Sequence, residues 1–256
     1  MRIAIAGKGG AGKTTVAATL ARLLARQGGP VLAIDADSNP NLAVALGVGG
    51  ELPAASALPT TLVSRRLDGP ALTESVDAVV DRYGLQGPEG VRVLLMGMPA
   101  HADEGCLCAA HATVSAVLGD LGARPEIATL VDMEASPEHL SRGTTRHVDV
   151  LLLVTEPYYR SLETIRRLAN LARELPIPRM AVLANKVREA ADAEAIAEFC
   201  DRHGLELLGT VPWSDAVVEA DRVAIPLIEA PDGDEVVASL LRIAERLPTA
   251  DQPNLA

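Results

Sequence analysis

The chain has 256 residues, of which 48% are hydrophobic and only 2% aromatic, and its formal net charge at pH 7 is -11. This length fits a single α/β domain, whose core must be built from Ala, Val, Leu and Ile. The negative charge argues against a nucleic-acid or anionic-membrane surface, since both need clustered Lys and Arg. We therefore expect neither nucleic acid nor membrane as a partner, and the lack of a leader-like N-terminal pattern predicts a cytoplasmic protein.

The first fifteen residues indicate a strand, a glycine loop and a helix. Residues 2–6 are a short apolar run typical of a buried parallel strand, and residues 13–27 carry apolar side chains at helical spacing. Between them, residues 7–14 match the G-x-x-x-x-G-K-[ST] template, whose backbone N–H groups and helix N-terminus bind phosphate. Lys13 is expected on the outer phosphates and the Thr14 hydroxyl on Mg²⁺. The nucleotide-binding residues predicted here are Gly9, Gly10, Ala11, Gly12, Lys13, Thr14 and Thr15.

A second lysine, Lys8, directly follows the first glycine of this loop, where an ordinary phosphate loop needs none. Residues 8–15, KGGAGKTT, resemble the deviant phosphate loop of the ParA/MinD superfamily, which also contains the nitrogenase iron protein. The resemblance implies that Lys8 reaches across a dimer interface to the partner's nucleotide. A solvated surface lysine is the alternative.

A second buried strand at residues 31–34 ends in the carboxylates Asp35 and Asp37. Carboxylates at the C-terminal edge of a parallel sheet face the crevice where ligands bind. The superfamily resemblance implies that Asp37 is the switch I aspartate, which positions or deprotonates the attacking water. Asp35 is expected to anchor the strand end and the Mg²⁺ shell. A helix N-cap followed by an Asn-Pro turn would explain the same residues.

Residues 48–90 give a weaker signal, with four prolines and one helical stretch at residues 73–83. We interpret this segment as a lid-like excursion from the sheet. A strand follows at residues 91–96.

Two thiols, Cys106 and Cys108, lie one residue apart before a helical stretch at residues 109–118. They supply half of a tetrahedral or square-planar ligand set, and a second copy about a two-fold axis would complete four sulfurs. The alternative is a pair of small buried hydrophobic residues. His101 and His111 are near enough in sequence to be accessory ligands, although we expect both at the surface.

The rest of the chain continues the alternation of strands and helices. The strand at residues 127–131 ends in Asp132, a Walker B arrangement that holds the Mg²⁺ shell, whereas the role of Glu134 stays open. Further strands are expected at residues 148–154, 180–183 and 206–211, and helices at residues 161–175, 193–202, 215–220 and 232–247. This order predicts one α/β domain over residues 1–247, a doubly wound, mainly parallel sheet with helices on both faces, followed by a disordered tail at residues 248–256.

Two pairs of residues after late strands resemble the base-binding elements of the superfamily. Asn185 and Lys186 correspond to the pair whose asparagine contacts the adenine edge, and a turn asparagine is the alternative. Pro212 and Trp213 correspond to part of the adenine wall. Cys200 lies in a helical run and is predicted to be core.

Three blocks together, residues 8–15, 105–108 and 131–143, resemble the CooC-type ATPases, the nickel-insertion accessory proteins of carbon monoxide dehydrogenase. The resemblance implies a P-loop NTPase fold of the SIMIBI type and a homodimer that hydrolyses ATP with Mg²⁺. It also implies that Cys106 and Cys108 of both protomers bind Ni²⁺ or Zn²⁺ at the interface. The implied client is a nickel enzyme such as carbon monoxide dehydrogenase.

Two other functions remain open. A positioning or partitioning ATPase of the MinD/ParA type would need a basic DNA surface or a cationic amphipathic helix, and neither is evident. A redox ATPase with a cluster bridging the dimer is the other alternative. The design of the nitrogenase iron protein is disfavoured, because no cysteine follows Asp132 within residues 133–142.

Overall fold

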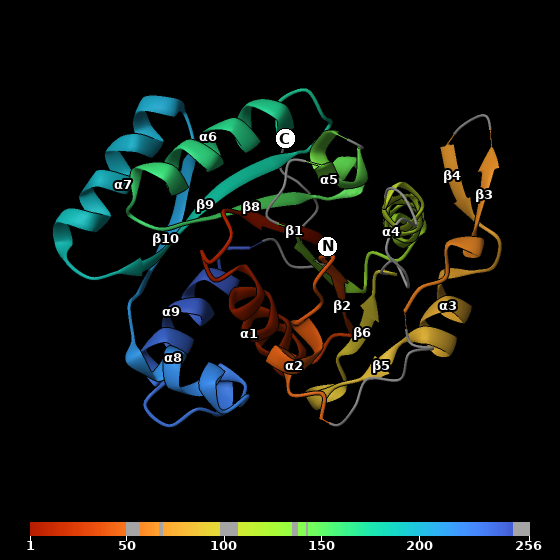
Figure 1. Cartoon of the computed structure of the whole chain (residues 1–256), viewed down its shortest axis with the longest axis horizontal. Coiled ribbons are helices and arrows are strands. Elements are labelled where there is room, and N and C mark those ends of the chain that lie inside the picture. Colours follow the sequence, from red (N-terminus) through yellow and green to blue (C-terminus); the bar gives the residue numbers. More distant parts are fainter. Residues whose placement is uncertain (50–56, 67–68, 98–106, 135–137, 142, 248–256) are drawn as a thin grey trace.

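A computed structural model describes residues 1–49, 57–66, 69–97, 107–134, 138–141 and 143–247 (Figure 1). The strands of its main sheet are β1 (Arg2–Gly7), β2 (Val31–Ala36), β5 (Leu85–Gln86), β6 (Arg92–Leu95), β7 (Ala128–Met133), β8 (Val150–Thr155), β9 (Arg179–Val187) and β10 (Glu206–Pro212). The helices are α1 (Lys13–Arg26), α2 (Leu42–Leu46), α3 (Val76–Tyr83), α4 (Cys108–Asp120), α5 (Glu138–Ser141), α6 (Tyr159–Ala172), α7 (Ala190–His203), α8 (Asp215–Arg222) and α9 (Asp234–Ala244).

Within the described residues these strands form one eight-stranded sheet in the order β10-β9-β8-β1-β7-β2-β6-β5. Neighbouring strands are parallel except β5, which runs antiparallel to β6. The central strand β1 lies between β7 and β8, so the loop that follows it opens at the middle of the carboxyl edge. The predicted doubly wound, mainly parallel sheet is confirmed.

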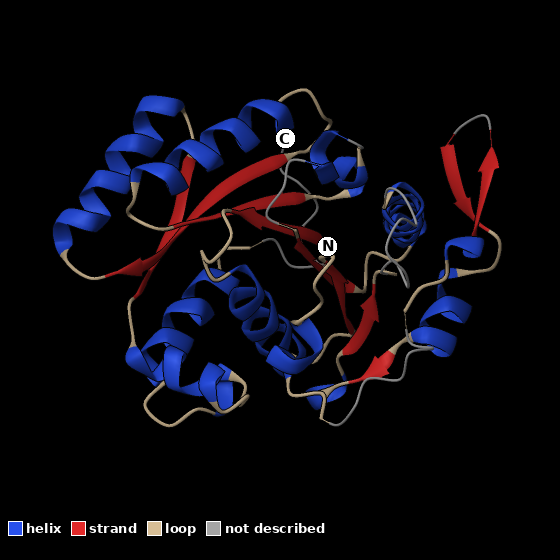
Figure 2. Ribbon diagram, viewed as in Figure 1, coloured by secondary structure: helices blue, strands red, loops and turns tan. Residues whose placement is uncertain are grey.

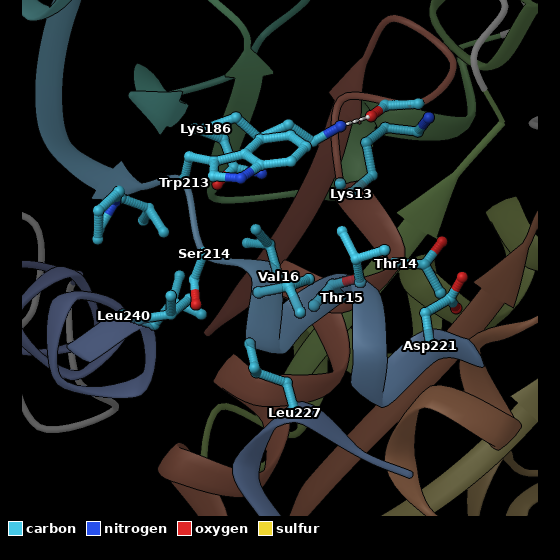
Figure 3. Close-up of a pocket in the computed structure, with 18 residues that line it drawn as sticks. Lys13, Thr14, Thr15, Val16, Lys186, Trp213, Ser214, Asp221, Leu227 and Leu240 are labelled. Carbon is cyan, nitrogen blue, oxygen red and sulfur yellow. Dashed lines mark hydrogen bonds between the residues drawn. The ribbon is translucent and has the colours of Figure 1, made fainter. Parts of the chain in front are cut away.

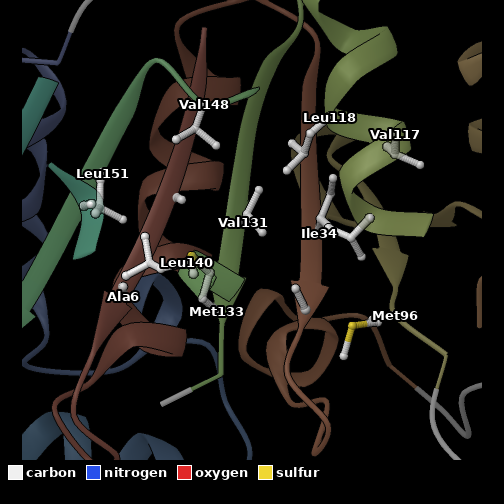
Figure 4. Close-up of a cluster of buried hydrophobic side chains, with 14 of the residues drawn as sticks. Ala6, Ile34, Met96, Val117, Leu118, Val131, Met133, Leu140, Val148 and Leu151 are labelled. Carbon is white, nitrogen blue, oxygen red and sulfur yellow. The ribbon is translucent and has the colours of Figure 1, made fainter. Parts of the chain in front are cut away.

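Helices cover both faces of the sheet (Figure 2). One buried cluster joins the strands to α4, α6 and α7, and Figure 4 shows its centre; a second joins them to α1, α2 and α9. Successive side chains of a strand point to opposite faces. In β1, Ala4 and Ala6 accordingly belong to the first cluster, and Ile3 and Ile5 to the second. Burial on both faces explains why these strands are continuous apolar runs rather than alternating ones.

Residues 48–90 contain an antiparallel hairpin that the sequence analysis did not predict, formed by β3 (Val63–Arg66) and β4 (Gly69–Leu72). The hairpin packs against α4. The helix expected at residues 73–83 begins later, at Val76, because the hydroxyl of Ser75 accepts a hydrogen bond from the N–H of Ala78 at 3.3 Å and caps it.

Two smaller observations complete the fold. Cys200 is core as predicted, with 1% of its surface exposed, and burial raises the pKa of its thiol to about 11. Among the helices that the structure describes, none has the length and apolar character needed to cross a membrane.

Candidate functional site

The glycine loop between β1 and α1 has a backbone that glycine alone permits at two positions. A Cβ on Gly7 would lie 2.2 Å from the carbonyl oxygen of Val154 in the neighbouring strand β8. Gly12 has a φ of +93°, and its Cβ would lie 2.4 Å from the Asn185 amide nitrogen. L-residues rarely adopt this φ. The loop is therefore fixed by its neighbours before any ligand arrives.

Two lysines of the loop have different surroundings. Lys13 is the first residue of α1, and only 7% of it is exposed. The helix dipole favours anions at the N-terminus, so the position of Lys13 does not stabilise the helix itself. Lys8 is partly exposed, and its Nζ donates to the carbonyl oxygen of Gly9 at 3.3 Å. The geometry thus provides one buried and one accessible ammonium group.

Thr14, Asp132 and Asp35 meet at the carboxyl edge of the sheet. The Thr14 hydroxyl donates to Asp132 Oδ2 at 2.6 Å, and the register of β2 and β7 places Asp35 opposite Asp132. Among the described residues, Asp132 Oδ1 is buried without a hydrogen-bond partner. A hydroxyl beside carboxylate oxygens, one of them unsatisfied, is a donor set that fits Mg²⁺ and its bound waters.

Burial dominates the electrostatics of this group. It raises the pKa of Asp132 to about 7, although the Thr14 hydrogen bond opposes the rise, and the charge of Asp35 adds to it. Burial also raises the pKa of Asp35 to about 6, opposed by hydrogen bonds from the backbone N–H groups of Leu42 and Asp37. A cation bound here would favour the ionised form of both carboxyl groups.

Residues 35–42, from the last two residues of β2 to the start of α2, are called switch I below. Asp35 Oδ2 accepts from the N–H of Leu42 at 2.8 Å, so Asp35, and not Asp37, bonds to the start of α2. Asp37 Oδ1 accepts from the N–H of Asn39 at 2.9 Å in a local turn, and its side chain stays half-buried. Asp37 is thus partly accessible, and its charge acts on Asp132.

A cavity of about 320 Å³ adjoins the loop and contains the predicted base-binding residues (Figure 3). Asn185, Lys186, Pro212 and Trp213 line it together with Gly10, Gly12 and the first residues of α1. The apolar wall of this cavity was not predicted, because it is composed of two residues from α8, two from α9 and one from the turn before α9. These residues are Val217, Val218, Leu227, Val236 and Leu240.

Asn185 and Lys186 also brace the loop itself. Asn185 Nδ2 donates to the carbonyl oxygen of Ala11 at 2.7 Å. Lys186 Nζ donates to the carbonyl oxygen of Gly10 at 2.5 Å and to Glu156 Oε1 at 2.9 Å. The sequence analysis did not single out Glu156, although a carboxylate directly after the apolar strand β8 was a usable signal. Both residues of the pair therefore act on the loop backbone as well as lining the cavity.

Trp213 forms an aromatic wall whose position is held from several sides. Its N–H donates to the carbonyl oxygen of Val187, and its Nε1 donates to Asp215 Oδ1 at 3.2 Å. The guanidinium carbon of Arg188 lies 3.9 Å from the ring centroid, a cation–π contact. The ring is thus preorganised as a stacking surface.

The predicted thiol pair lies partly outside the described residues, since Cys106 is not among them. Cys108 is the first residue of α4 and is exposed. It opens onto a cavity of about 350 Å³ that follows one side of α4 and is also lined by the hairpin strand β4 and by Gly143, Thr144, Arg146 and His147. In the described part of the chain, no group of three or more His, Cys, Asp or Glu residues has the arrangement of a metal site.

His111 differs from its prediction. We expected a surface residue, but only 1% of His111 is exposed, because the first turn of α4 packs inward against His139. A single histidine among alanines on a helix fits a surface or a buried position, so its burial could not be predicted from the sequence. His101 lies outside the described residues.

Comparison with known proteins agrees with this geometry. Residues 3–227 match the family model of the CobQ/CobB/MinD/ParA nucleotide-binding domain. The carbon monoxide dehydrogenase accessory protein CooC of Rhodospirillum rubrum is 38% identical over 235 residues, which cover 88% of each chain. An uncharacterised ATP-binding protein of Methanocaldococcus jannaschii is 35% identical over 235 residues, covering 89% of this chain and 91% of that protein.

Among solved structures, the septum site-determining protein MinD of Pyrococcus horikoshii, complexed with Mg-ADP, has the same fold. It superposes with a TM-score of 0.70 at 22% sequence identity and covers 95% of this chain and 94% of its own. The phosphate loop, the buried carboxylates beside Thr14 and these similarities lead to one conclusion. The chain belongs to the CobQ/CobB/MinD/ParA nucleotide-binding family, within which it is an ATPase similar to CooC.

Proposed function

We propose that this ATPase works as a cytoplasmic homodimer and delivers nickel to a client nickel enzyme. The observation that carries the proposal is an exposed cysteine, Cys108, at the start of a helix in a chain that also holds a complete phosphate loop. When it is reduced, a cysteine at a helix N-terminus is well placed to bind metal as the thiolate. The relative from Rhodospirillum rubrum, named an accessory protein of carbon monoxide dehydrogenase, supports a client of that kind.

In this proposal, Cys106 and Cys108 of both protomers capture one Ni²⁺ between them. Four thiolates from two copies of one loop satisfy the ligand number that neither copy reaches alone. Zn²⁺ would compete for the same sulfurs, so selectivity for nickel depends on geometry and supply.

Hydrolysis proceeds by attack of water on the γ-phosphorus of ATP, which breaks the bond to the bridging oxygen and yields ADP and phosphate. Lys13 neutralises phosphate charge from its buried position, and Asp37 orients the water and accepts its proton. Mg²⁺, held at Thr14 with Asp132 and Asp35 around it, would supply further positive charge. The partner's Lys8 neutralises the charge that develops during bond breaking.

Nickel titration followed by size-exclusion chromatography tests the metal site. We expect one Ni²⁺ per two chains in the parent and none in the Cys106→Ala/Cys108→Ala variant. Cys200→Ala is the matched control, because that thiol is buried in the core, and it should bind as the parent does. One Ni²⁺ on each monomer, or unchanged uptake by the double variant, would contradict the proposal.

A further inference from the structure

We propose that two buried histidines, His111 and His139, are positioning residues that link the nucleotide site to the helix carrying Cys108. They are called the histidine pair below. His111 belongs to the first turn of α4, and His139 belongs to α5, which follows Asp132 in the chain. The inference rests on the proposed function in one respect, since it takes Cys108 as a metal ligand.

His139 connects α5 to switch I. None of its surface is exposed, and its Nε2 lies 2.8 Å from the carbonyl oxygen of Ala36. Because a carbonyl oxygen only accepts, Nε2 carries the proton and donates. Ala36 stands between the two switch I carboxylates, Asp35 and Asp37. A displacement of switch I at this point therefore acts directly on the ring of His139.

His111 carries the contact into α4. Its ring centroid lies 4.2 Å from that of His139, and the two ring planes are inclined by 46°. Cys108 and His111 are three residues apart on the helix, so they lie on the same side of its first turn. One helical turn thus separates Cys108 from His111, the residue that contacts the His139 ring.

Switch I is joined a second time to the segment that leads into α5. The hydroxyl of Ser38 donates to Glu134 Oε1 at 3.3 Å, and Glu134 comes two residues after Asp132. Asp132 in turn accepts from Thr14 at the phosphate loop. Switch I therefore contacts Glu134 through Ser38 and His139 through the carbonyl group of Ala36.

Packing alone does not explain why these two buried positions carry imidazole rings. A core that required only packing would use apolar residues, because burying an imidazole costs its hydration unless hydrogen bonds replace it. A hydrogen bond depends on distance and direction, whereas an apolar contact tolerates sliding. The bond from His139 to Ala36 therefore ties the position of α4 to the position of switch I.

The rate of Cys108 alkylation in the full chain tests this link without any metal. The background is Cys106→Ala under reducing conditions, in which Cys200 does not compete because it is buried and its pKa is raised to about 11. We expect a non-hydrolysable ATP analogue to change the rate by about five-fold or more, a usual size for coupling between sites. His139→Phe keeps a ring against His111 but loses the donor, and should reduce the change to less than about two-fold.

Two further variants separate positioning from folding. His139→Gln keeps an N–H donor and should retain most of the nucleotide effect. His203→Phe is the matched control: its ring lies 4.4 Å from that of Phe199 on α7, so the variant alters a similar ring contact and should change nothing. If His139→Phe does not fold, His111→Ala replaces it and must abolish the effect. A folded His139→Phe with the parent's rate change, or a His139→Gln that is equally uncoupled, would overturn the inference.

Nickel binding by the same variants distinguishes this inference from the proposed function. If nickel affinity shifts with the ATP analogue equally in the parent and in His139→Phe, the histidine pair has no coupling role while the proposed function stands. If the parent takes up no nickel, the proposed function fails, and the alkylation rates of Cys108 still decide whether the histidine pair transmits nucleotide state.

Discussion

Asp132 and Asp35 are buried carboxyl groups that lie opposite each other on adjacent strands. Burial raises both pKa values, which means that ionising these groups in the ligand-free protein is unfavourable. The site is therefore arranged for a bound cation rather than for the protein's own stability. Functional sites commonly carry such a cost.

The raised pKa of Asp132 predicts how stability depends on pH. Without nucleotide or Mg²⁺, the folded chain keeps the Asp132 proton up to about pH 7, whereas the unfolded chain releases it near the ordinary value of 3.8. The folded state thus binds more protons between these limits, so the contribution of Asp132 to the free energy of unfolding falls as pH rises from about 4 to about 7. Urea unfolding over this range measures it.

Asp132→Asn provides the control, since the amide can still accept from Thr14 but does not titrate. The variant should lose stability less steeply with pH than the parent does. Mg-ADP should flatten the parent's dependence, because the cation stabilises the ionised carboxylates. Parallel pH curves for parent and variant without ligand would contradict the assignment.

At the scale of elements, the phosphate loop and the end of β9 pack closely against each other at Gly12. The Asn185 amide lies against Gly12 and donates to Ala11. Loop and strand are thus matched in shape, although 172 residues of chain separate Gly12 from Asn185 (185 − 12 − 1).

Gly12→Ala should destabilise the protein through two effects, a clash with Asn185 and the strain of its left-handed backbone. Gly10→Ala is the control, because Gly10 has a φ of +82° but open space around its Cβ. Gly10→Ala should lower the free energy of unfolding only by the backbone strain, about 1 kcal/mol. Urea unfolding should place Gly12→Ala below Gly10→Ala, and Asn185→Ala should remove most of the difference. Equal stabilities of the two glycine variants would refute the contact.

The same elements show what the sequence could predict. The strands that carry Asp35, Asp132 and Asn185 near their carboxyl ends were identified, because strands buried on both faces are continuous apolar runs, although each extends two to four residues further than predicted. The short elements α2, α5 and β5 were missed, since two to five residues carry no periodicity.

The hydrogen-bond partners of single polar residues could not be predicted from the sequence either. The bond of His139 to Ala36 and that of Lys186 to Gly10 join residues far apart in the chain. Such contacts depend on how elements pack, which local patterns do not encode. The phosphate loop was identifiable because its chemistry lies in adjacent residues.

At the scale of the whole molecule, the proposed dimer places each Lys8 at the other protomer's nucleotide. Lys8→Ala should lower turnover by about 10³-fold, because it removes a charge-neutralising group supplied in trans. Asp37→Ala should also lower turnover strongly, because it removes the group that orients the water. In a mixture, the Lys8→Ala protomer keeps Asp37 and receives an intact Lys8 from its partner. Phosphate release should therefore recover when the two inactive variants are combined.

Size-exclusion chromatography first shows that the two chains pair. If the mixture is then as inactive as each variant alone, Lys8 acts within its own protomer. Lys13→Ala with Asp37→Ala serves as the negative control, because Lys13 acts in its own site. In a dimer of these two variants, one nucleotide site lacks Lys13 and the other lacks Asp37. Neither site is complete, so phosphate release should not recover.

The position of β1 at the middle of the sheet also bears on how the chain acquires its structure. This strand leaves the ribosome well before both of its neighbours, β7 and β8, whose synthesis begins only at Ala128. Pairings so distant in sequence form slowly and late. During synthesis, the apolar residues of β1 therefore stay exposed until β7 and β8 are available, so we expect nascent chains of this protein to bind chaperones.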